Sequence, residues 1–238
     1  MPEVKIARFV DLDACRSIFS ETSTFVLRSA EYYRKHYDER ELIVRDRFGG
    51  EGETSCFVLS CWTMLAGDEP TRDEWGIFLD RDESGHSRER VMAIVSAPSR
   101  VHAFLERAFE LEDEKTQVRQ RYPFIRVADR AVTYADEVAE EIGPDNIMDL
   151  TAFTKRLRFA KEKEYRFAMP CGGVPHVIDT YIFARAPDEY MDKCFVNPQM
   201  GAGDKGQLQQ IIQNATCGYG HFGDKKPYQV IANVDDLF

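Results

Sequence analysis

Four polar residues of this 238-residue sequence have types and an order that suit the breaking of a glycosidic bond in a nucleotide: Arg8, Ser60, Glu162 and Glu164. A guanidinium group binds a pyrophosphate through paired hydrogen bonds. A serine hydroxyl can position a ribose. A carboxylate can hold a ribose hydroxyl and stabilise the oxocarbenium-like state that forms as the bond breaks. We therefore take Glu164 as the candidate catalytic carboxylate and Glu162 as a second one.

Each of these residues also has an ordinary structural explanation. Arg8 continues the apolar phase of Val4 and Ile6, where an arginine must find an anion or lie at the end of a strand. Ser60 could be a core hydroxyl whose hydrogen bonds are satisfied, and Glu164 could lie on a solvated strand face. The sequence leaves the structural and the functional interpretation open.

Two of the candidates lie on predicted strands in the first third of the chain. Val4–Val10 alternates between apolar and polar residues and carries Arg8. Cys56–Trp62 is a nearly continuous apolar run, which is typical of a strand buried on both faces. Ser60 is its polar exception, near the C-terminal end.

The two glutamates lie on a third predicted strand, Glu162–Met169, which alternates with a period of two residues. Glu164 and Arg166 point to one face. The other face is apolar and consists of Tyr165, Phe167 and Met169. The apolar face predicts a core position, whereas the charged face points either into a cleft or into water.

The rest of the chain mixes strands and helices without a steady β-α-β rhythm, and hairpin signals cluster in its second half. Further strands are predicted at 22–27, 90–96, 124–134 (broken near Asp129), 177–183, 194–197 and 229–234. Helices are predicted after Asp11 or Asp13 and at 30–37, 71–79, 100–111 and 207–215, with Ser29, Thr71 and Ser99 as N-caps. Residues 45–54 read as a loop, and the strand at 177–183 as the antiparallel neighbour of Glu162–Met169. The pattern favours an α+β fold in a single domain over residues 1–238, with a mixed, mostly antiparallel sheet, flanking helices and a helical insertion around 99–150.

The composition is that of a protein that buries a hydrophobic core, with 43% hydrophobic and 12% aromatic residues. Its formal net charge of −10 repels phosphate backbones, so broad nucleic-acid binding is disfavoured. One local group of arginines is basic although the chain as a whole is acidic, and we interpret it as a solvent-exposed charged surface: Arg119, Arg121, Arg126 and Arg130.

No apolar run approaches the length that crosses a bilayer, and the N-terminus has no signal-peptide pattern. The six cysteines are scattered, which indicates reduced thiols and not a disulfide framework. We therefore expect a cytoplasmic protein without a membrane partner.

Three other motifs are weaker. Gly201–Gly206 matches the Gly-x-Gly-x-x-Gly pattern, but too little chain follows it to complete a nucleotide-binding sheet, so we predict a flexible loop there. Two Cys–His pairs lack the spacing of zinc sites, and no metal site is predicted: Cys171 with His176, and Cys217 with His221. A metal-dependent hydrolase that uses Asp136 with the two glutamates is a third, weaker alternative.

Several short stretches resemble a widespread bacterial family known as domain-of-unknown-function family 2971. They are Ala7–Phe9, Cys56–Trp62 with Trp75–Gly76, Phe159–Arg166 and Lys193–Pro198. The resemblance covers most of the chain, and its most specific part is the Glu-x-Glu-Tyr-Arg segment. The chain departs from that family where an Asn-Asp-Pro-Phe-like motif is replaced by Tyr33–Tyr37.

A more distant resemblance concerns the order arginine, serine, Glu-x-Glu, which is similar to the Arg-Ser-Glu arrangement of ADP-ribosyltransferases. The resemblance implies NAD as substrate, with Glu164 against the nicotinamide ribose and Glu162 near the acceptor. Arg8, Ser60 and Trp75 are then the candidate NAD-binding residues. A small nucleotide is the implied partner, and the sequence does not indicate the acceptor.

The alternative is a non-enzymatic binding or interaction module, for example in sensing or defence. It predicts that Glu162, Glu164 and Arg166 form exposed surface ion pairs, each of which contributes little to stability. The enzyme hypothesis instead requires Arg8, Ser60 and Glu164 to meet in one pocket.

Overall fold

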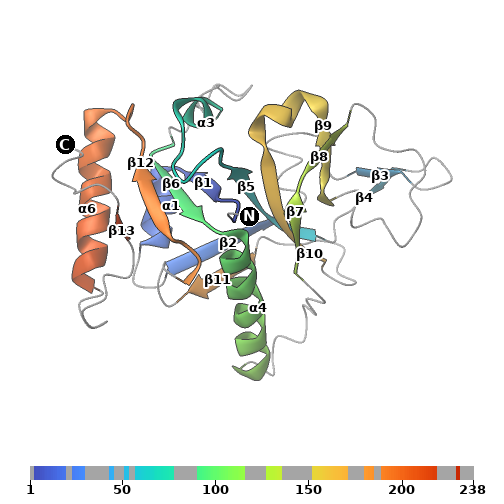
Figure 1. Ribbon diagram of the computed structural model, residues 1–238. Coiled ribbons are helices and arrows are strands. Elements are labelled where there is room, and N and C mark those ends of the chain that lie inside the picture. Colours follow the sequence, from blue (N-terminus) through green and yellow to red (C-terminus); the bar gives the residue numbers. More distant parts are fainter. Residues whose placement is uncertain are drawn as a thin grey trace. The chain divides into compact units, whose positions relative to one another are not determined.

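The structure is a computed structural model of the chain (Figure 1). It describes residues 3–19, 23–29, 43–45, 51–53, 57–77, 90–115, 127–135, 152–170, 180–184, 189–218 and 229–230. The contacts divide the chain into two compact units. The first unit consists of residues 1–25, 64–104 and 182–238, and the second of residues 26–63 and 105–181. The single domain over residues 1–238, with its insertion, stays a prediction.

The first unit is built on a run of short strands. β1 (Ile6–Val10) pairs with β6 (Met92–Ser96), and β6 pairs with β12 (Lys193–Val196), both antiparallel. β12 then pairs in parallel with β13 (Gln229–Val230). The predicted strands at these places are confirmed: β1 and β6 are shorter than their sequence patterns, and β12 begins one residue earlier than predicted.

Three helices of the first unit begin where the sequence provides a cap or a helix former. α1 (Leu12–Ile18) starts at Asp11, whose side chain accepts a 2.9 Å hydrogen bond from the Ala14 amide. α3 (Arg72–Gly76) has a capping box made by Thr71 and Glu74. α6 (Ala202–Gly218) includes most of the Gly201–Gly206 motif, so the predicted flexible loop is wrong.

The core of the first unit surrounds β1 on both sides. Phe9 packs edge-on against Trp75, with ring centroids 4.9 Å apart. A second aromatic group packs Phe25 against Phe104 and Tyr190, at centroid distances of 5.4 and 4.9 Å. Aromatic pairs in this geometry contribute about 0.5–1.5 kcal/mol beyond the area they bury.

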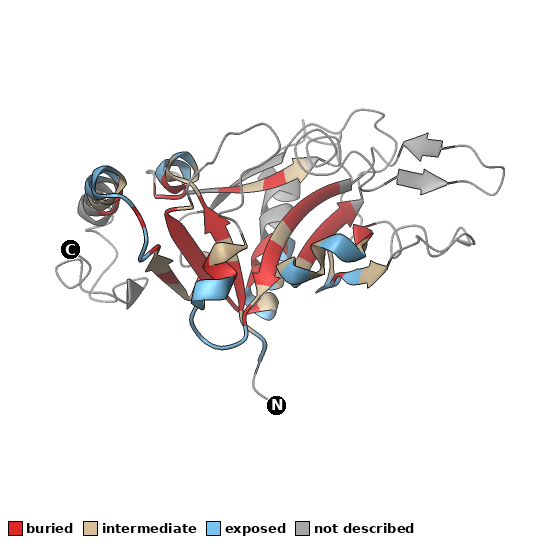
Figure 2. Ribbon diagram, turned by 90° about the horizontal axis from the view of Figure 1, so that it is seen from above, coloured by how far each residue is buried: buried red, intermediate tan, exposed pale blue. Residues whose placement is uncertain are grey.

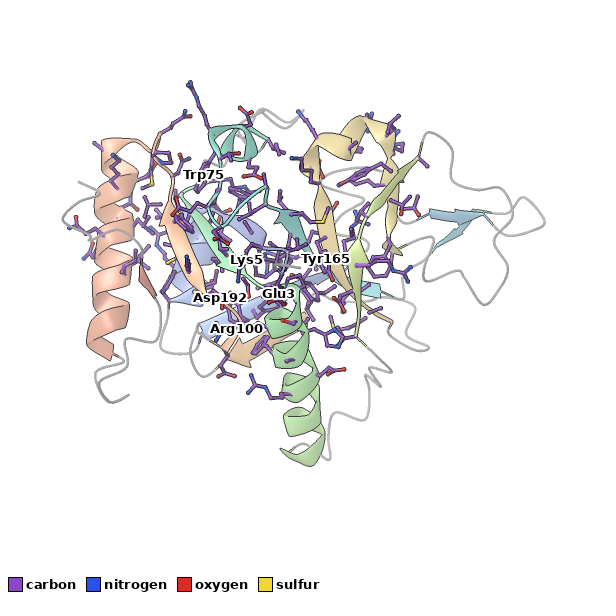
Figure 3. The ribbon with its side chains drawn as sticks, viewed as in Figure 1. Glu3, Lys5, Trp75, Arg100, Tyr165 and Asp192 are labelled. Atoms are coloured by element: carbon purple, nitrogen blue, oxygen red, sulfur yellow. The ribbon has the colours of Figure 1, made fainter. Side chains whose placement is uncertain are left out.

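Hydrogen bonds between charged side chains connect distant segments at the surface of this unit. Asp192 accepts a hydrogen bond from Lys5 at 3.1 Å and another from Arg100, which also donates to the Met191 carbonyl at 3.1 Å (Figure 3). Ser99 donates to the Glu3 carboxylate from inside the first turn of α4 (Pro98–Lys115). The prediction that Ser99 is the N-cap of this helix is therefore wrong. Pro98 occupies the first helical position, which is a common place for proline.

The second unit has an antiparallel arrangement in the order β2, β5, β10, β7. These strands are β2 (Ser23–Ser29), β5 (Phe57–Met64), β10 (Glu164–Pro170) and β7 (Ala128–Ala131). A parallel pair joins β8 (Thr133–Ala135) to β9 (Thr154–Arg156), and the 3-10 helix η2 (Leu157–Glu162) leads from β9 to β10. β3 (Ile43–Arg45) and β4 (Glu51–Glu53) form a small antiparallel pair.

Three further predictions for the second unit differ from the structure. The strand at 177–183 was predicted to pair with β10, but β10 pairs with β5 and β7, and β11 (Thr180–Ala184) is not its neighbour. The break between β7 and β8 falls at Val132 and not near Asp129. The segment 45–54 contains β4 and is not entirely a loop. The predicted helix at 30–37, with the motif at Tyr33–Tyr37, lies outside the described residues.

The architecture is α+β with a mostly antiparallel sheet, as the sequence predicts. Buried residues concentrate on the strands, whereas helices carry many of the exposed ones (Figure 2). Among the described residues, no helix is long and apolar enough to cross a membrane.

Candidate functional site

The second unit contains a group of buried charged side chains around the start of β10. Glu164 is 5% exposed and Arg166 is fully buried. The two residues are two positions apart on one strand, so their side chains leave on the same face. Arg166 donates from Nε to Glu164 Oε1 at 2.8 Å and from Nη2 to Oε2 at 3.1 Å. A guanidinium that binds both carboxylate oxygens makes a strong and well-oriented ion pair.

A second cation completes the group from β9. Lys155 Nζ lies 3.1 Å from Glu164 Oε2 and 2.7 Å from Glu162 Oε2. We call these four residues, Lys155, Glu162, Glu164 and Arg166, the ion cluster. Glu162 is its most accessible member, with a side chain 24% exposed, against 8% for Lys155 and 7% for Glu164. Solvent therefore reaches the ion cluster chiefly through Glu162.

The turn between η2 and β10 brings the two glutamates to the same ammonium group. Lys163 stands between them in the left-handed conformation, with φ 45° and ψ 48°, and is the one non-glycine residue with positive φ in the described part of the chain. That conformation costs a residue with a Cβ about 1–2 kcal/mol. The contacts of the ion cluster must outweigh this cost.

The strain at Lys163 gives a first prediction. Lys163→Val is expected to lower the free energy of unfolding by about 1–2 kcal/mol, because a β-branched side chain is especially disfavoured at positive φ. Lys163→Gly removes the same side chain without that penalty and is expected to be as stable as the natural chain or more so. Urea unfolding of both variants tests this. Equal stability of the two variants would contradict a strained turn.

The charge state of Glu164 follows from its neighbours. Burial by itself raises the pKa of a carboxyl group. The charges of Arg166 and Lys155, with hydrogen bonds from Arg166 and Cys61, outweigh burial and lower the pKa of Glu164 to about 2. Glu164 is therefore an ionised carboxylate at neutral pH.

A backbone carbonyl and a phenol hydroxyl accept further hydrogen bonds from residues of the ion cluster. Arg166 Nη1 donates to the Ala152 carbonyl at 2.9 Å, and the Glu164 amide donates to the Tyr134 hydroxyl at 2.7 Å. Burial, together with the negative charges of Glu164 and Glu162, raises the pKa of Tyr134 to about 12. Tyr134 thus stays a neutral phenol. A buried ion pair with this many hydrogen bonds is the kind that a fold can tolerate.

Ser60 does not join the ion cluster. In the β5–β10 register it lies opposite Phe167, whereas Cys61 lies opposite Arg166. Because side chains alternate between faces along a strand, Ser60 and Glu164 point to opposite faces of the two strands. Ser60 is fully buried, and its hydroxyl accepts a 2.9 Å hydrogen bond from Trp62 Nε1. The structure therefore does not bring the predicted serine and glutamate together.

The remaining predicted NAD-binding residues, Arg8 and Trp75, belong to the first unit. The Arg8 guanidinium carbon lies 5.5 Å from the centroid of the Phe25 ring, a cation–π contact from the middle of β1. Trp75 is 4% exposed and packs in the core against Phe9, so its ring is a core side chain in this structure. The predicted contact of Arg8 with a pyrophosphate stays a prediction.

The predicted exposure of the charged face of β10 is wrong. The non-enzymatic alternative expected Glu162, Glu164 and Arg166 as surface ion pairs, but only Glu162 is appreciably exposed. On this face Ala152 and Phe153 pack with Leu59 and Ala168 and exclude water from it.

Sequence reasoning missed Lys155 and Tyr134. A buried glutamate requires a cation, and several basic residues, Lys155 among them, precede Glu164 closely in the sequence. This nearness is the one signal that points to Lys155. No sequence signal connects Tyr134 to Glu164. Among the described residues, no group of His, Cys, Asp and Glu could hold a metal ion. Asp136 and both Cys–His pairs lie outside the described side chains, whereas Cys15, Cys61 and Cys194 are described and form no disulfide.

No family model matches this chain, and no curated protein or solved structure is significantly similar to it. The resemblances to family 2971 and to the ADP-ribosyltransferases stay predictions.

Proposed function

We propose that the chain is a non-enzymatic binding or interaction module in which the ion cluster stabilises the fold. The observation that carries this proposal is the position of Glu164, which is 5% exposed and bonded to both Arg166 and Lys155. Two cations already neutralise this carboxylate, so little of its charge is available to stabilise an oxocarbenium-like state. A ribose hydroxyl would also have to displace a well-formed ion pair.

A second candidate is the NAD-cleaving, ADP-ribosyltransferase-like reaction, and three observations favour it. Glu164 is held ionised, as this chemistry requires, and the accessible Glu162 shares Lys155 with it. The strained residue Lys163 stands between the two glutamates, and backbone strain often occurs at functional sites. In this reaction Glu164 would contact the nicotinamide ribose and Glu162 the acceptor, after the ion cluster opens.

One experiment separates the two functions. The purified chain is incubated with NAD at about millimolar concentration, which is near the upper end of usual KM values, and release of nicotinamide is followed over time. A binding module releases nicotinamide no faster than buffer alone. Turnover that Glu164→Gln abolishes, and that the exposed-site control Glu106→Gln retains, would overturn the proposed function in favour of the enzyme.

A further inference from the structure

The segment that carries the ion cluster concentrates positive charge in an otherwise acidic chain. Six of the 31 lysines and arginines lie between residues 155 and 166, beside only two of the 41 acidic residues. Those two, Glu162 and Glu164, bond to the buried cations Lys155 and Arg166. The other four cations lie nearer the solvent, and we call them the basic surface: Arg156, Arg158, Lys161 and Lys163.

The basic surface belongs to a short and defined piece of backbone. Figure 1 shows η2 as the yellow coil that joins β9 to β10. Arg158, Lys161 and Lys163 are exposed there, and Arg156 is partly exposed at the end of β9. Six residues of 3-10 helix span about 12 Å at roughly 2.0 Å per residue. The cations are thus held within the size of a small ligand.

An aromatic ring gathers three cations of this segment. The Phe159 centroid lies 4.6 Å from the Arg158 guanidinium carbon, 4.8 Å from Lys155 Nζ and 5.8 Å from the Arg156 guanidinium carbon. Cation–π contacts of this kind each contribute about 0.5–1 kcal/mol at exposed sites. They hold the Arg156 and Arg158 guanidinium groups beside one ring, where a single anion can meet both.

We propose that the basic surface binds a compact oligophosphate, such as the phosphate groups of a nucleoside di- or triphosphate. Guanidinium groups fit phosphate oxygens through paired hydrogen bonds, and lysines add charge. A long polyanion would extend beyond η2 over a chain whose net charge is −10 even with this segment included, and would be repelled there. This inference names the ligand class of the binding function proposed above and rests on it.

Calorimetric titration of the full chain with inorganic triphosphate, at low ionic strength, tests the inference. The natural chain is expected to bind, and Arg158→Gln with Lys161→Gln is expected to weaken binding at least about tenfold, since each lost phosphate contact is charge-assisted. Arg107→Gln is the matched control, because Arg107 is an exposed arginine of α4 in the same unit. It is expected to bind as the natural chain does.

Three outcomes would overturn the inference. The natural chain does not bind triphosphate at millimolar concentration, or the control loses as much affinity as the double variant, or a single-stranded oligonucleotide binds more tightly than triphosphate. The last result would assign the basic surface to nucleic acid. Release of nicotinamide from NAD would overturn the proposed function instead, so the two failures are distinguishable.

Discussion

Replacing Arg166 with methionine is expected to lower the free energy of unfolding by about 3–5 kcal/mol. Methionine fills much of the same volume, but among the described residues it leaves only Lys155 as a cation bonded to the buried Glu164 carboxylate. It also leaves the Ala152 carbonyl without the donor that it has now. The loss of one partner from a buried ion pair costs far more than the net contribution of the intact pair, because the other charge stays in a low dielectric.

Urea unfolding measures this change, and Arg158→Met is its control. Arg158 is an exposed arginine eight positions earlier in the same segment, so its replacement is expected to cost no more than about 1 kcal/mol. A loss for Arg166→Met as small as that of the control would show that Glu164 does not depend on Arg166.

The ion cluster is also expected to make stability depend on pH in acid. The carboxyl group of Glu164 has a pKa near 4.5 when unfolded and about 2 when folded. Between these values the unfolded chain binds a proton that the folded chain does not, so stability falls as pH falls. This contribution to stability is fully present above pH 4.5 and is lost progressively as the pH falls toward 2.

Unfolding free energies measured from pH 7 down to pH 3 test this dependence. Other carboxyl groups also titrate in this range, so the informative quantity is the difference between the natural chain and Glu164→Gln. That difference is expected to shrink as pH falls, while Glu106→Gln, at an exposed position of α4, follows the natural chain throughout. A difference that stays constant with pH would mean that the pKa of Glu164 is not lowered by folding.

Local patterns in the sequence predicted two strands near the candidate site, but the predicted strand Glu162–Met169 begins at Glu164, and Glu162 is instead the last residue of η2. The period of two residues located β10, and the apolar run located β5 as a strand buried on both faces. Asp11 and Thr71 were recognisable as N-caps, since their side chains suit the first amides of a helix. These signals are short-range, and they survive folding because the tertiary contacts agree with them.

The composition of the site depended on contacts that a single sequence does not specify. Whether Ser60 and Glu164 share a face is decided by the register of β5 against β10, and a shift of one residue reverses the answer. The contact of Lys155 with both glutamates depends on the left-handed conformation of Lys163, and a lysine rarely adopts that conformation. The charged face of β10 was therefore assigned to a cleft or to water, although Ala152 and Phe153 help to bury it.

A double-mutant cycle between Glu164 and Arg166 measures how strongly the two side chains depend on each other in the folded chain. It compares the unfolding free energies of the natural chain, Glu164→Gln, Arg166→Met and the double variant. If the two residues act as one buried structural pair, the double variant is destabilised by about 1–3 kcal/mol less than the sum of the single variants. Losses that add within about 0.5 kcal/mol would contradict a structural pairing of Glu164 with Arg166 and would favour a catalytic role for Glu164.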